Sequence, residues 1–338
     1  MKVSLPFFSV RPLVGFGRQV VMAILPAFLF LTLLFLQGCE QTHPPLKVGT
    51  NIWPGYESLY IARDKQFINP EQVSLTESVN ATQVLRAFKA GQLDVAALTM
   101  DEALTLQASV RDLRVIAVMD FSHGADVLIA KPGIKTLQEL SGRTLIVEKS
   151  AVGAIIMQSA LDKAGLEKYE ISVRNAPVNE HLKLWQDEAV AGVVTFEPFK
   201  SLLTLEGGHV LFDSSEIPGR VMDVLVVHEE TARNRPDQLR HLLAGHFRAL
   251  TFMAENRAES ASIMSERLKI PPYQVLSSFE SIRIPDLEEN RNLLGESGGF
   301  KQQIFQLKQM MLNTGLLSQK ISIGDDFLTD SFLPRADE

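Results

Sequence analysis

The sequence predicts an α/β fold in which two lobes, each built on a mainly parallel sheet, enclose a ligand cleft. Short apolar segments with strand character alternate with amphipathic segments of about 10–15 residues, a pattern typical of βαβ units. The alternation occurs in two blocks, and from residue 235 onward the pattern changes to consecutive helices. The chain has 338 residues, 46% of them hydrophobic, which is enough for two domains with buried cores.

The first block begins at residue 46. Its apolar segments predict strands at 46–50, 73–77, 94–98, 114–119 and 126–130. Helical spacing predicts helices at 56–66, 82–91 and 101–108. Gly91 stands where the second of these helices ends, a position at which glycine commonly forms the C-terminal cap.

The second block repeats the alternation. Strands are predicted at 144–148, 169–174, 192–196, 209–212 and 222–228, and helices at 154–165 and 181–186. Later helices are predicted at 236–256, 258–268, 271–282, 286–294 and 300–313. Extended segments near 128–134 and 217–224 separate the blocks, which predicts two chain crossings. We therefore expect residues 46–130 and 222–338 to form lobe 1 and residues 131–221 to form lobe 2.

The N-terminal segment has the features of a secretory signal. Lys2, Arg11 and Arg18 precede an apolar run over 20–36, and the run is followed by Gln37, Gly38 and Cys39. We expect residues 1–38 to be a signal peptide and residues 39–45 a tether. The alternative is an uncleaved anchor, because 17 residues is at the lower limit for a membrane-spanning helix.

Cys39 is the only cysteine of the chain, so no internal disulfide can form. The sequence Leu36-Gln37-Gly38-Cys39 resembles the cleavage site of bacterial lipoproteins. That resemblance implies acylation of Cys39 and attachment to the periplasmic side of a bacterial membrane. Glu40 is not the aspartate usual for inner-membrane retention, so the choice of membrane stays open.

The charge balance argues against a nucleic-acid partner. The formal net charge is -7, and residues 1–38 contain three basic residues and no acidic one. Without them, 30 basic residues remain against 40 acidic ones, a net charge of -10. A nucleic-acid partner requires a basic face, so solubility is the simpler explanation of this charge.

Several motifs in order resemble the solute-binding proteins of nitrate, taurine and alkanesulfonate ABC transporters, a family that also includes proteins binding the pyrimidine precursors of thiamine. The matching segments are 47–60 (KVGTNIWPGYESLY), 90–96 (AGQLDVA), 122–126 (SHGAD), 137–143 (LQELSGR), 196–199 (FEPF) and 223–227 (DVLVV). The resemblance covers about residues 46 to 295. It implies the type II periplasmic-binding-protein fold, a role in ABC import, and no catalysis, cofactor or metal. We expect a monomer that binds a small molecule and contacts a permease or a membrane receptor.

Candidate ligand contacts follow the predicted strands, because ligands of open α/β sheets bind beyond the carboxyl ends of the strands. Asn51, Trp53 and Tyr56 follow the first strand and offer aromatic surface with polar tips. The alternative is that Trp53 packs the loop and Tyr56 begins a helix. Thr99 and Asp101 follow the third strand, where the alternative is a helix cap.

Further candidates lie near the crossing and in the second block. His123 and Asp126 flank a glycine, with a purely structural role as the alternative. Backbone N–H groups at a helix start could bind the ligand after the strand 144–148, where Ser150 could instead act as a cap. These residues are Ser150, Ala151 and Val152. Glu197 follows the strand 192–196, and its alternative role is to stabilise a helix N-terminus.

The candidates include three acids, Asp101, Asp126 and Glu197, and no Lys or Arg except Arg220 at the second crossing. This set suits a ligand with an amine or ring nitrogens better than nitrate, although a zwitterion such as an aminosulfonate also fits.

Two rival functions are compatible with this fold. An enzyme related to the pyrimidine synthases of this fold is disfavoured, because residues 40–338 contain no cysteine. A ligand sensor that reports to a membrane receptor requires the same lobe closure and stays open.

Overall fold

The computed structural model describes residues 43–110, 112–149, 152–295, 299–318 and 321–335, together with residues 1, 4, 6 and 9. The chain divides into two compact units, Met1–His43 and Pro44–Glu338, and every helix and strand described below belongs to the second. Cys39 and its neighbours lie outside the described residues. Within the described residues, no helix combines the length and the apolar character that crossing a membrane requires.

Six strands form the first sheet, in the order β11-β4-β10-β3-β1-β2. Their bounds are β1 Leu46–Asn51, β2 Val73–Ser78, β3 Val95–Thr99, β4 Leu113–Ser122, β10 Met222–His228 and β11 Ile282–Arg283. β1 pairs in parallel with β2 and β3, whereas β10 runs antiparallel to β3 and β4. This sheet is therefore mixed, with the expected parallel pairing confined to β1, β2 and β3.

Five strands form the second sheet, in the order β7-β6-β8-β5-β9. Their bounds are β5 Asp126–Ala130, β6 Thr144–Val147, β7 Ser172–Asn175, β8 Val190–Phe196 and β9 His209–Asp213. β6 pairs in parallel with β7 and β8, and β5 runs antiparallel to β8 and β9. The strand that receives the chain from the other sheet, β10 in the first and β5 in the second, runs antiparallel to both of its neighbours.

One strand lies in a different sheet from the expected one. The sequence predicts the segment 126–130 as part of lobe 1, but it forms β5 and pairs within the second sheet. All five of its residues are buried, as expected of a strand with neighbours on both sides. The first crossing consequently lies between Ser122 and Asp126, where Gly124 has a φ of 110°, rather than near 128–134.

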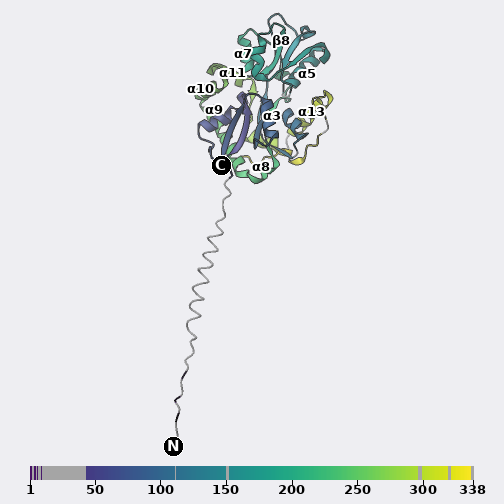
Figure 1. Ribbon diagram of the computed structural model, residues 1–338. Helices are drawn as coiled ribbons and strands as arrows, with labels where there is room; N and C mark the ends of the chain where they lie inside the picture. Colours follow the sequence, from purple (N-terminus) through teal and green to yellow (C-terminus); the bar gives the residue numbers. More distant parts are fainter. Residues whose placement is uncertain are drawn as a thin grey trace. The chain divides into compact units, whose positions relative to one another are not determined.

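The helices divide between the two sheets (Figure 1). Those of the first block are α2 Glu57–Asp64, α3 Ala81–Lys89 and α4 Met100–Gln107, and those of the second are α5 Gly153–Ala164, α6 His181–Trp185 and α7 Phe199–Leu205. The late helices are α8 Glu229–Asn234, α9 Pro236–Glu255, α10 Arg257–Leu268, α11 Pro272–Phe279, α12 Leu287–Leu294 and α13 Phe300–Asn313. They pack in the half that contains the six-stranded sheet: α9 packs on α2, α12 on β4 and α13 on α4.

Local sequence sets several helix ends. The side chain of Asn80 accepts a hydrogen bond from the backbone N–H of Gln83 at 3.0 Å and caps α3. Asp286 caps α12 in the same way. Gly165 ends α5 in the left-handed conformation that glycine adopts at low cost.

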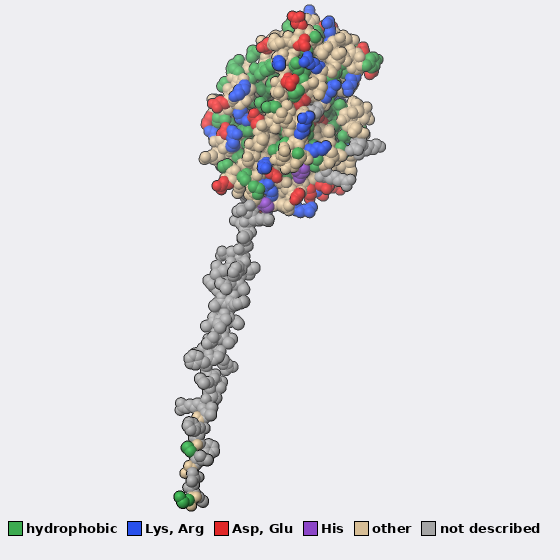
Figure 2. Space-filling view, viewed as in Figure 1, with side chains coloured by type: hydrophobic (Ala, Val, Ile, Leu, Met, Phe, Trp, Pro, Cys, Tyr) green, Lys and Arg blue, Asp and Glu red, His purple; other side chains and the backbone are tan. Residues whose placement is uncertain are grey.

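Two buried clusters of apolar side chains hold the fold together. The larger one contains most of the six-stranded sheet and its helices and extends into α5. A smaller one lies in the second half, where Val127 of β5 and Val193 of β8 pack with Trp185. Figure 2 shows acidic and basic side chains interspersed with hydrophobic ones over the face in view.

The two crossing segments are hydrogen-bonded to each other. The hydroxyl groups of Ser122 and Ser214 lie 2.7 Å apart, and the Ser214 hydroxyl also accepts from the backbone N–H of Gly124 at 2.7 Å. The N–H of Ser122 donates to the carbonyl of Val221 at 3.1 Å. These bonds join the two chain segments that connect the sheets. A hinge between the halves would lie at these segments.

Candidate functional site

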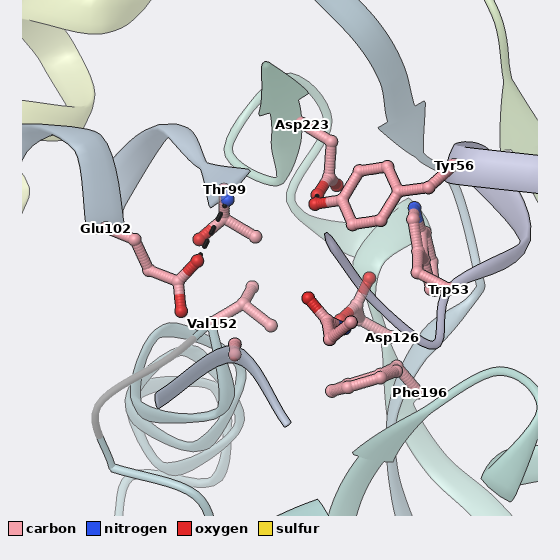
Figure 3. A pocket seen from close by; sticks show the side chains of 10 residues that line it. Trp53, Tyr56, Thr99, Glu102, Asp126, Val152, Phe196 and Asp223 are labelled. Atoms are coloured by element: carbon pink, nitrogen blue, oxygen red, sulfur yellow. Dashed lines mark hydrogen bonds between the residues drawn. The ribbon is translucent and has the colours of Figure 1, made fainter. Parts of the chain in front are cut away.

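A pocket with about 320 Å³ of empty space lies between the two sheets (Figure 3). The six-stranded half contributes Asn51, Trp53, Tyr56, Ala81, Thr99, Glu102 and Asp223, and the five-stranded half contributes Asp126, Val152 and Phe196. This volume includes space open to solvent, and only about 20 Å³ of it can hold the centre of a water molecule, so the two halves lie close together around the pocket. Because both halves line it, a bound molecule would contact both.

Aromatic side chains form two walls of the pocket. The ring of Trp53 stands edge-on to that of Phe196, with the centroids 5.7 Å apart and the planes at 83°. Phe196 is backed by Phe199 in a second edge-on contact at 6.3 Å. Tyr56 lies beside Trp53, and its hydroxyl group points toward Asp223 (Figure 3). These rings offer flat apolar surface on which a planar ligand can stack.

Two buried carboxyl groups lie behind the aromatic side chains. Nε1 of Trp53 donates a hydrogen bond to Oδ2 of Asp120 at 2.9 Å, and the hydroxyl group of Tyr56 donates to Oδ1 of Asp223. Asp120 and Asp223 are directly opposite each other in the β4–β10 pairing. Each aromatic ring is thus positioned by a carboxyl group of the six-stranded sheet.

An irregularity in strand pairing brings Asp120 to this position. The β4–β10 register shifts between Asp120 and Val118, so that the strand bulges at this point. Asn290 of α12 covers the bulge: its Oδ1 accepts from the N–H of Val118 at 2.8 Å, and its Nδ2 donates to the Val118 carbonyl at 3.1 Å. Gly55 allows the close approach on the other side, because a Cβ atom there would overlap Oδ2 of Asp120.

Burial makes these carboxyl groups hard to ionise. Burial raises the pKa of Asp120 to about 7, and the nearby charge of Asp126 adds to the rise. Burial likewise raises the pKa of Asp126 to about 7. The pKa values of Asp223 and Glu102 are raised well above their usual range by burial and by neighbouring carboxylates, Asp120 and Asp101 respectively. Desolvation of a charged group is the common cause.

The pocket contains many of the residues that the strand-end rule predicted. Its lining includes Asn51, Trp53, Tyr56, Thr99, Asp126 and Val152. The backbone N–H of Thr99 donates to Oε2 of Glu102 at 3.0 Å, so this residue also takes part in the start of α4. The prediction for Ser150 and Ala151 falls outside the described residues.

Three predicted contacts lie elsewhere. Asp101 is buried in the first turn of α4 and does not line the pocket; burial raises its pKa to about 6. His123 is exposed at the crossing, where its backbone N–H donates to the carbonyl of Ser281 at 2.8 Å. Glu197 is buried and accepts from the N–H of Ser201 at 3.2 Å, which is the helix-stabilising role considered as its alternative.

Sequence reasoning missed five residues of the site, of which Ala81, at the start of α3, carried no polar or aromatic signal. Asp223 begins an antiparallel strand, and the start of such a strand lies at the same edge as the ends of its parallel neighbours. Asp120 interrupts an apolar strand, which was a usable signal, as was Phe196 at the end of β8. Glu102 lies one turn into α4 and carried no such signal. Among the described residues, no group of three or more His, Cys, Asp or Glu side chains is arranged to hold a metal ion.

Comparisons with known proteins identify related sequences. The model of the NMT1-like family matches residues 40–268. A candidate binding protein of Brucella abortus is 20% identical over 327 residues, which cover 93% of this chain and 98% of the relative.

Solved structures share the fold. The alkanesulfonate-binding protein of Xanthomonas axonopodis, bound to MOPS, superposes with a TM-score of 0.69 at 16% identity, covering 87% of this chain and 99% of that protein. The ligand-binding component of an ABC-type import system from Staphylococcus aureus, with zinc bound, gives a TM-score of 0.70 at 16% identity, covering 86% and 98%. These likenesses establish the fold expected from the sequence, that of periplasmic binding proteins.

Proposed function

The chain belongs to the NMT1-like family, and from this premise we propose that it is the solute-binding component of an ABC importer, acting outside the cytoplasm. It captures a small polar organic solute between its two halves and delivers it to a membrane permease. The names of the structural neighbours, which bind alkanesulfonates or serve ABC import, support this role. The observation that carries the proposal is the pocket lined from both sheets, with Trp53 of one half against Phe196 of the other.

The two sheets correspond, in this proposal, to two lobes that close on the solute. The inter-sheet connections at Ser122–Asp126 and Asp213–Met222 would act as the hinge. Asn80 and Thr82 of the first half donate to Asn179 and Glu148 of the second, at 3.0 and 2.7 Å, and these bonds would form on closure. A ligand held between closing lobes is shielded from water, which strengthens its polar contacts.

The lining favours a nitrogen-containing solute over a simple anion. Glu102, Asp126 and Asp223 line the pocket, and no Lys or Arg is among its described lining residues. Carboxylates accept hydrogen bonds from amino groups and ring N–H groups, whereas an anion requires donors or positive charge. The aromatic walls add stacking surface for a flat ring.

A thermal-shift screen tests this function. The segment Pro44–Glu338, a compact unit on its own, is freed of ligand by unfolding and refolding and screened against aminopyrimidines, other nitrogen heterocycles, alkanesulfonates, taurine and nitrate. A solute at 100 times its dissociation constant should stabilise the protein by about 2.7 kcal/mol. A hit that also fails to accumulate in cells lacking the protein supports import. Silence across the panel, together with no small molecule in the purified protein by mass spectrometry, would contradict solute binding.

We further propose that the protein is held at the membrane by a lipid on Cys39 after removal of residues 1–38. Support comes from the basic start, the apolar run and the Leu-Gln-Gly-Cys sequence. A Cys39→Ser variant expressed in a bacterium should move from the membrane fraction to the soluble periplasmic fraction or stay unprocessed. Membrane association unchanged in that variant, with no acyl mass on the wild-type Cys39 peptide, would contradict the anchor.

A further inference from the structure

Three buried carboxyl groups from the two halves lie at the pocket: Asp126 and Asp223 line it, and Asp120 lies directly behind Trp53. Asp120 and Asp223 belong to β4 and β10 of the six-stranded sheet, and Asp126 begins β5 of the five-stranded sheet. Asp120 is 0% exposed, and Asp126 and Asp223 are 3% exposed. Asp126 acts electrostatically on both of the others. Closing the halves therefore brings like charges together in a site from which water is excluded.

Positive charge is scarce around these groups in the described part of the chain. Nζ of Lys200 lies 3.4 Å from the Glu197 carboxylate, and its charge lowers the cost of ionising Asp126. The same Nζ donates a hydrogen bond to the carbonyl of Gly124 at 3.0 Å. No Lys or Arg lines the pocket among its described residues. Burying several carboxylates without a counter-charge is costly, because ionised groups lose their hydration.

Oxygen atoms in this cluster lack donors. Oδ1 of Asp120 and Oε1 of Glu102 are buried and accept no hydrogen bond from the described residues. Both residues are at least nine-tenths buried, and Glu102 lines the pocket. A buried acceptor without a donor costs free energy, so the site is complete only when a proton or a ligand N–H group supplies one.

We propose that the two halves close only when a positively charged nitrogen group of the solute lies between Asp126 and Asp223, with Asp120 behind them, so that the physiological solute is an organic cation. This inference rests on the solute-binding role proposed above and names the class of solute. The cation removes the repulsion between the halves, and one of its N–H groups supplies the donor missing at Glu102, which lines the pocket. Trp53, Tyr56 and Phe196 provide the aromatic faces that attract an organic cation. Anionic and neutral solutes leave the repulsion in place.

Protons can replace the cation, which gives a test that needs no solute. Besides one another and Glu102, the charged or titratable groups facing the three carboxyls are Tyr56, Asp101, Glu197 and Lys200. In an open, hydrated state the carboxyl pKa values return toward about 3.9. In the closed state those of Asp120 and Asp126 are about 7. The closed state thus binds more protons between about pH 4 and 7 and is favoured as the pH falls through that window, about tenfold per pH unit for each proton bound.

The experiment measures the distance between the halves in ligand-free Pro44–Glu338. Gln83→Cys in α3 and Lys183→Cys in α6 carry the spin labels, because both positions are exposed and this segment contains no other cysteine. Double electron–electron resonance measures the distance between the two labels and so reports closure. We expect a long distance at pH 8.5 and a short one at pH 5. Asp126→Asn, and separately Asp120→Asn, should populate the short distance at pH 8.5. Asp237→Asn, whose side chain is 94% exposed, is the matched control and should behave like the unmutated pair.

Charge-matched probes complete the test at pH 8.5. Benzylamine and benzamidine should shorten the distance, while benzyl alcohol, benzenesulfonate and magnesium chloride should not. Any one of three results overturns the proposal. The distance is independent of pH in every variant, neither cation closes the halves, or the sulfonate or the alcohol closes them. The solute-binding role is judged separately: a neutral or anionic hit in the thermal-shift screen that closes the halves at any pH keeps that role and removes only the cation requirement.

Discussion

The ring of Trp53, which follows β1 of the six-stranded sheet, stands edge-on against the ring of Phe196, which ends β8 of the five-stranded sheet. Trp53 is in turn held by Asp120 through its indole N–H. A single side chain therefore joins the aromatic wall of one half, the buried carboxyl cluster and the facing wall of the other half. The predictions below begin with this residue.

Trp53→Phe should weaken solute binding by about tenfold, or about 1.4 kcal/mol. The ring is kept, but Oδ2 of Asp120 loses its donor, so the carboxyl group is neither positioned nor satisfied. Titration calorimetry with a solute from the thermal-shift screen measures the change. Trp185→Phe is the matched control, because Trp185 is equally buried but lies in the small cluster of the second half. Equal losses in both variants would contradict the assignment of Trp53.

Gly55→Ala should abolish or severely reduce binding, by at least about 100-fold, because the added Cβ would overlap the Asp120 carboxylate and crowd Nε1 of Trp53. The same change at Gly324, where a Cβ meets no atom within 4 Å, should leave the affinity within about twofold. Calorimetric titration and circular dichroism of both variants separate lost binding from lost fold. Unchanged affinity in Gly55→Ala would mean that the solute does not depend on this arrangement.

Asn290→Ala should lower the free energy of unfolding by about 3 kcal/mol. It leaves the backbone N–H and carbonyl of Val118 unpaired inside the protein. The bulge that positions Asp120 then loses its support. Urea unfolding gives the value. Asn234→Ala, at an exposed position at the end of α8, is the control and should change stability by less than about 0.5 kcal/mol. A similarly small change for Asn290→Ala would show that the bulge needs no such support.

Arg267→Leu should destabilise the protein by about 3 kcal/mol at pH 8 and by clearly less at pH 5. Arg267 pairs with the buried Glu57, and burial raises the Glu57 pKa to about 7 despite this partner. The folded-state pKa lies above the unfolded value of about 4.5, so the Glu57 contribution to stability is full below pH 4.5 and is lost as the pH rises through 7. Without the guanidinium group, the ionised form becomes costlier still, which enlarges the loss at pH 8.

Urea unfolding at both pH values measures this difference. Arg233→Leu is the control, since Arg233 is 75% exposed and pairs with Glu229 on the surface, where ion pairs contribute little. It should cost less than about 0.5 kcal/mol at either pH. An equal loss for Arg267→Leu at pH 5 and pH 8 would mean that packing, rather than the buried charge, sets the cost.

Much of the fold could be predicted from local pattern because its strands are apolar and its helices amphipathic. The apolar run 192–196 predicts a strand, and every residue of β8 is buried; the apolar run 222–228 does the same, and all of β10 except His228 is buried. Segments with weaker patterns were missed. The short helix Phe199–Leu205 has one buried residue. The two-residue strand β11 begins soon after α11 ends, and its first residue, Ile282, falls within the helix predicted at 271–282.

The site was predicted only in part, because the strand-end rule applies to parallel strands. Trp53 and Tyr56, which the rule predicts, line the pocket, but Asp223 lies at the start of an antiparallel strand and Asp120 within one. The position of Asp120 depends on a bulge and on Asn290, which is 170 residues away in the sequence. Such pairings are set by tertiary structure, and no spacing in the sequence encodes them.

The most direct test of the central claim is a crystal structure of Pro44–Glu338 with a solute from the thermal-shift screen. We predict density for the solute between the two sheets, in contact with Trp53 of one half and Phe196 of the other, with a nitrogen atom facing the carboxyl groups of Asp126 and Asp223. A solute bound at any other place, or contacting residues of only one half, would contradict the account.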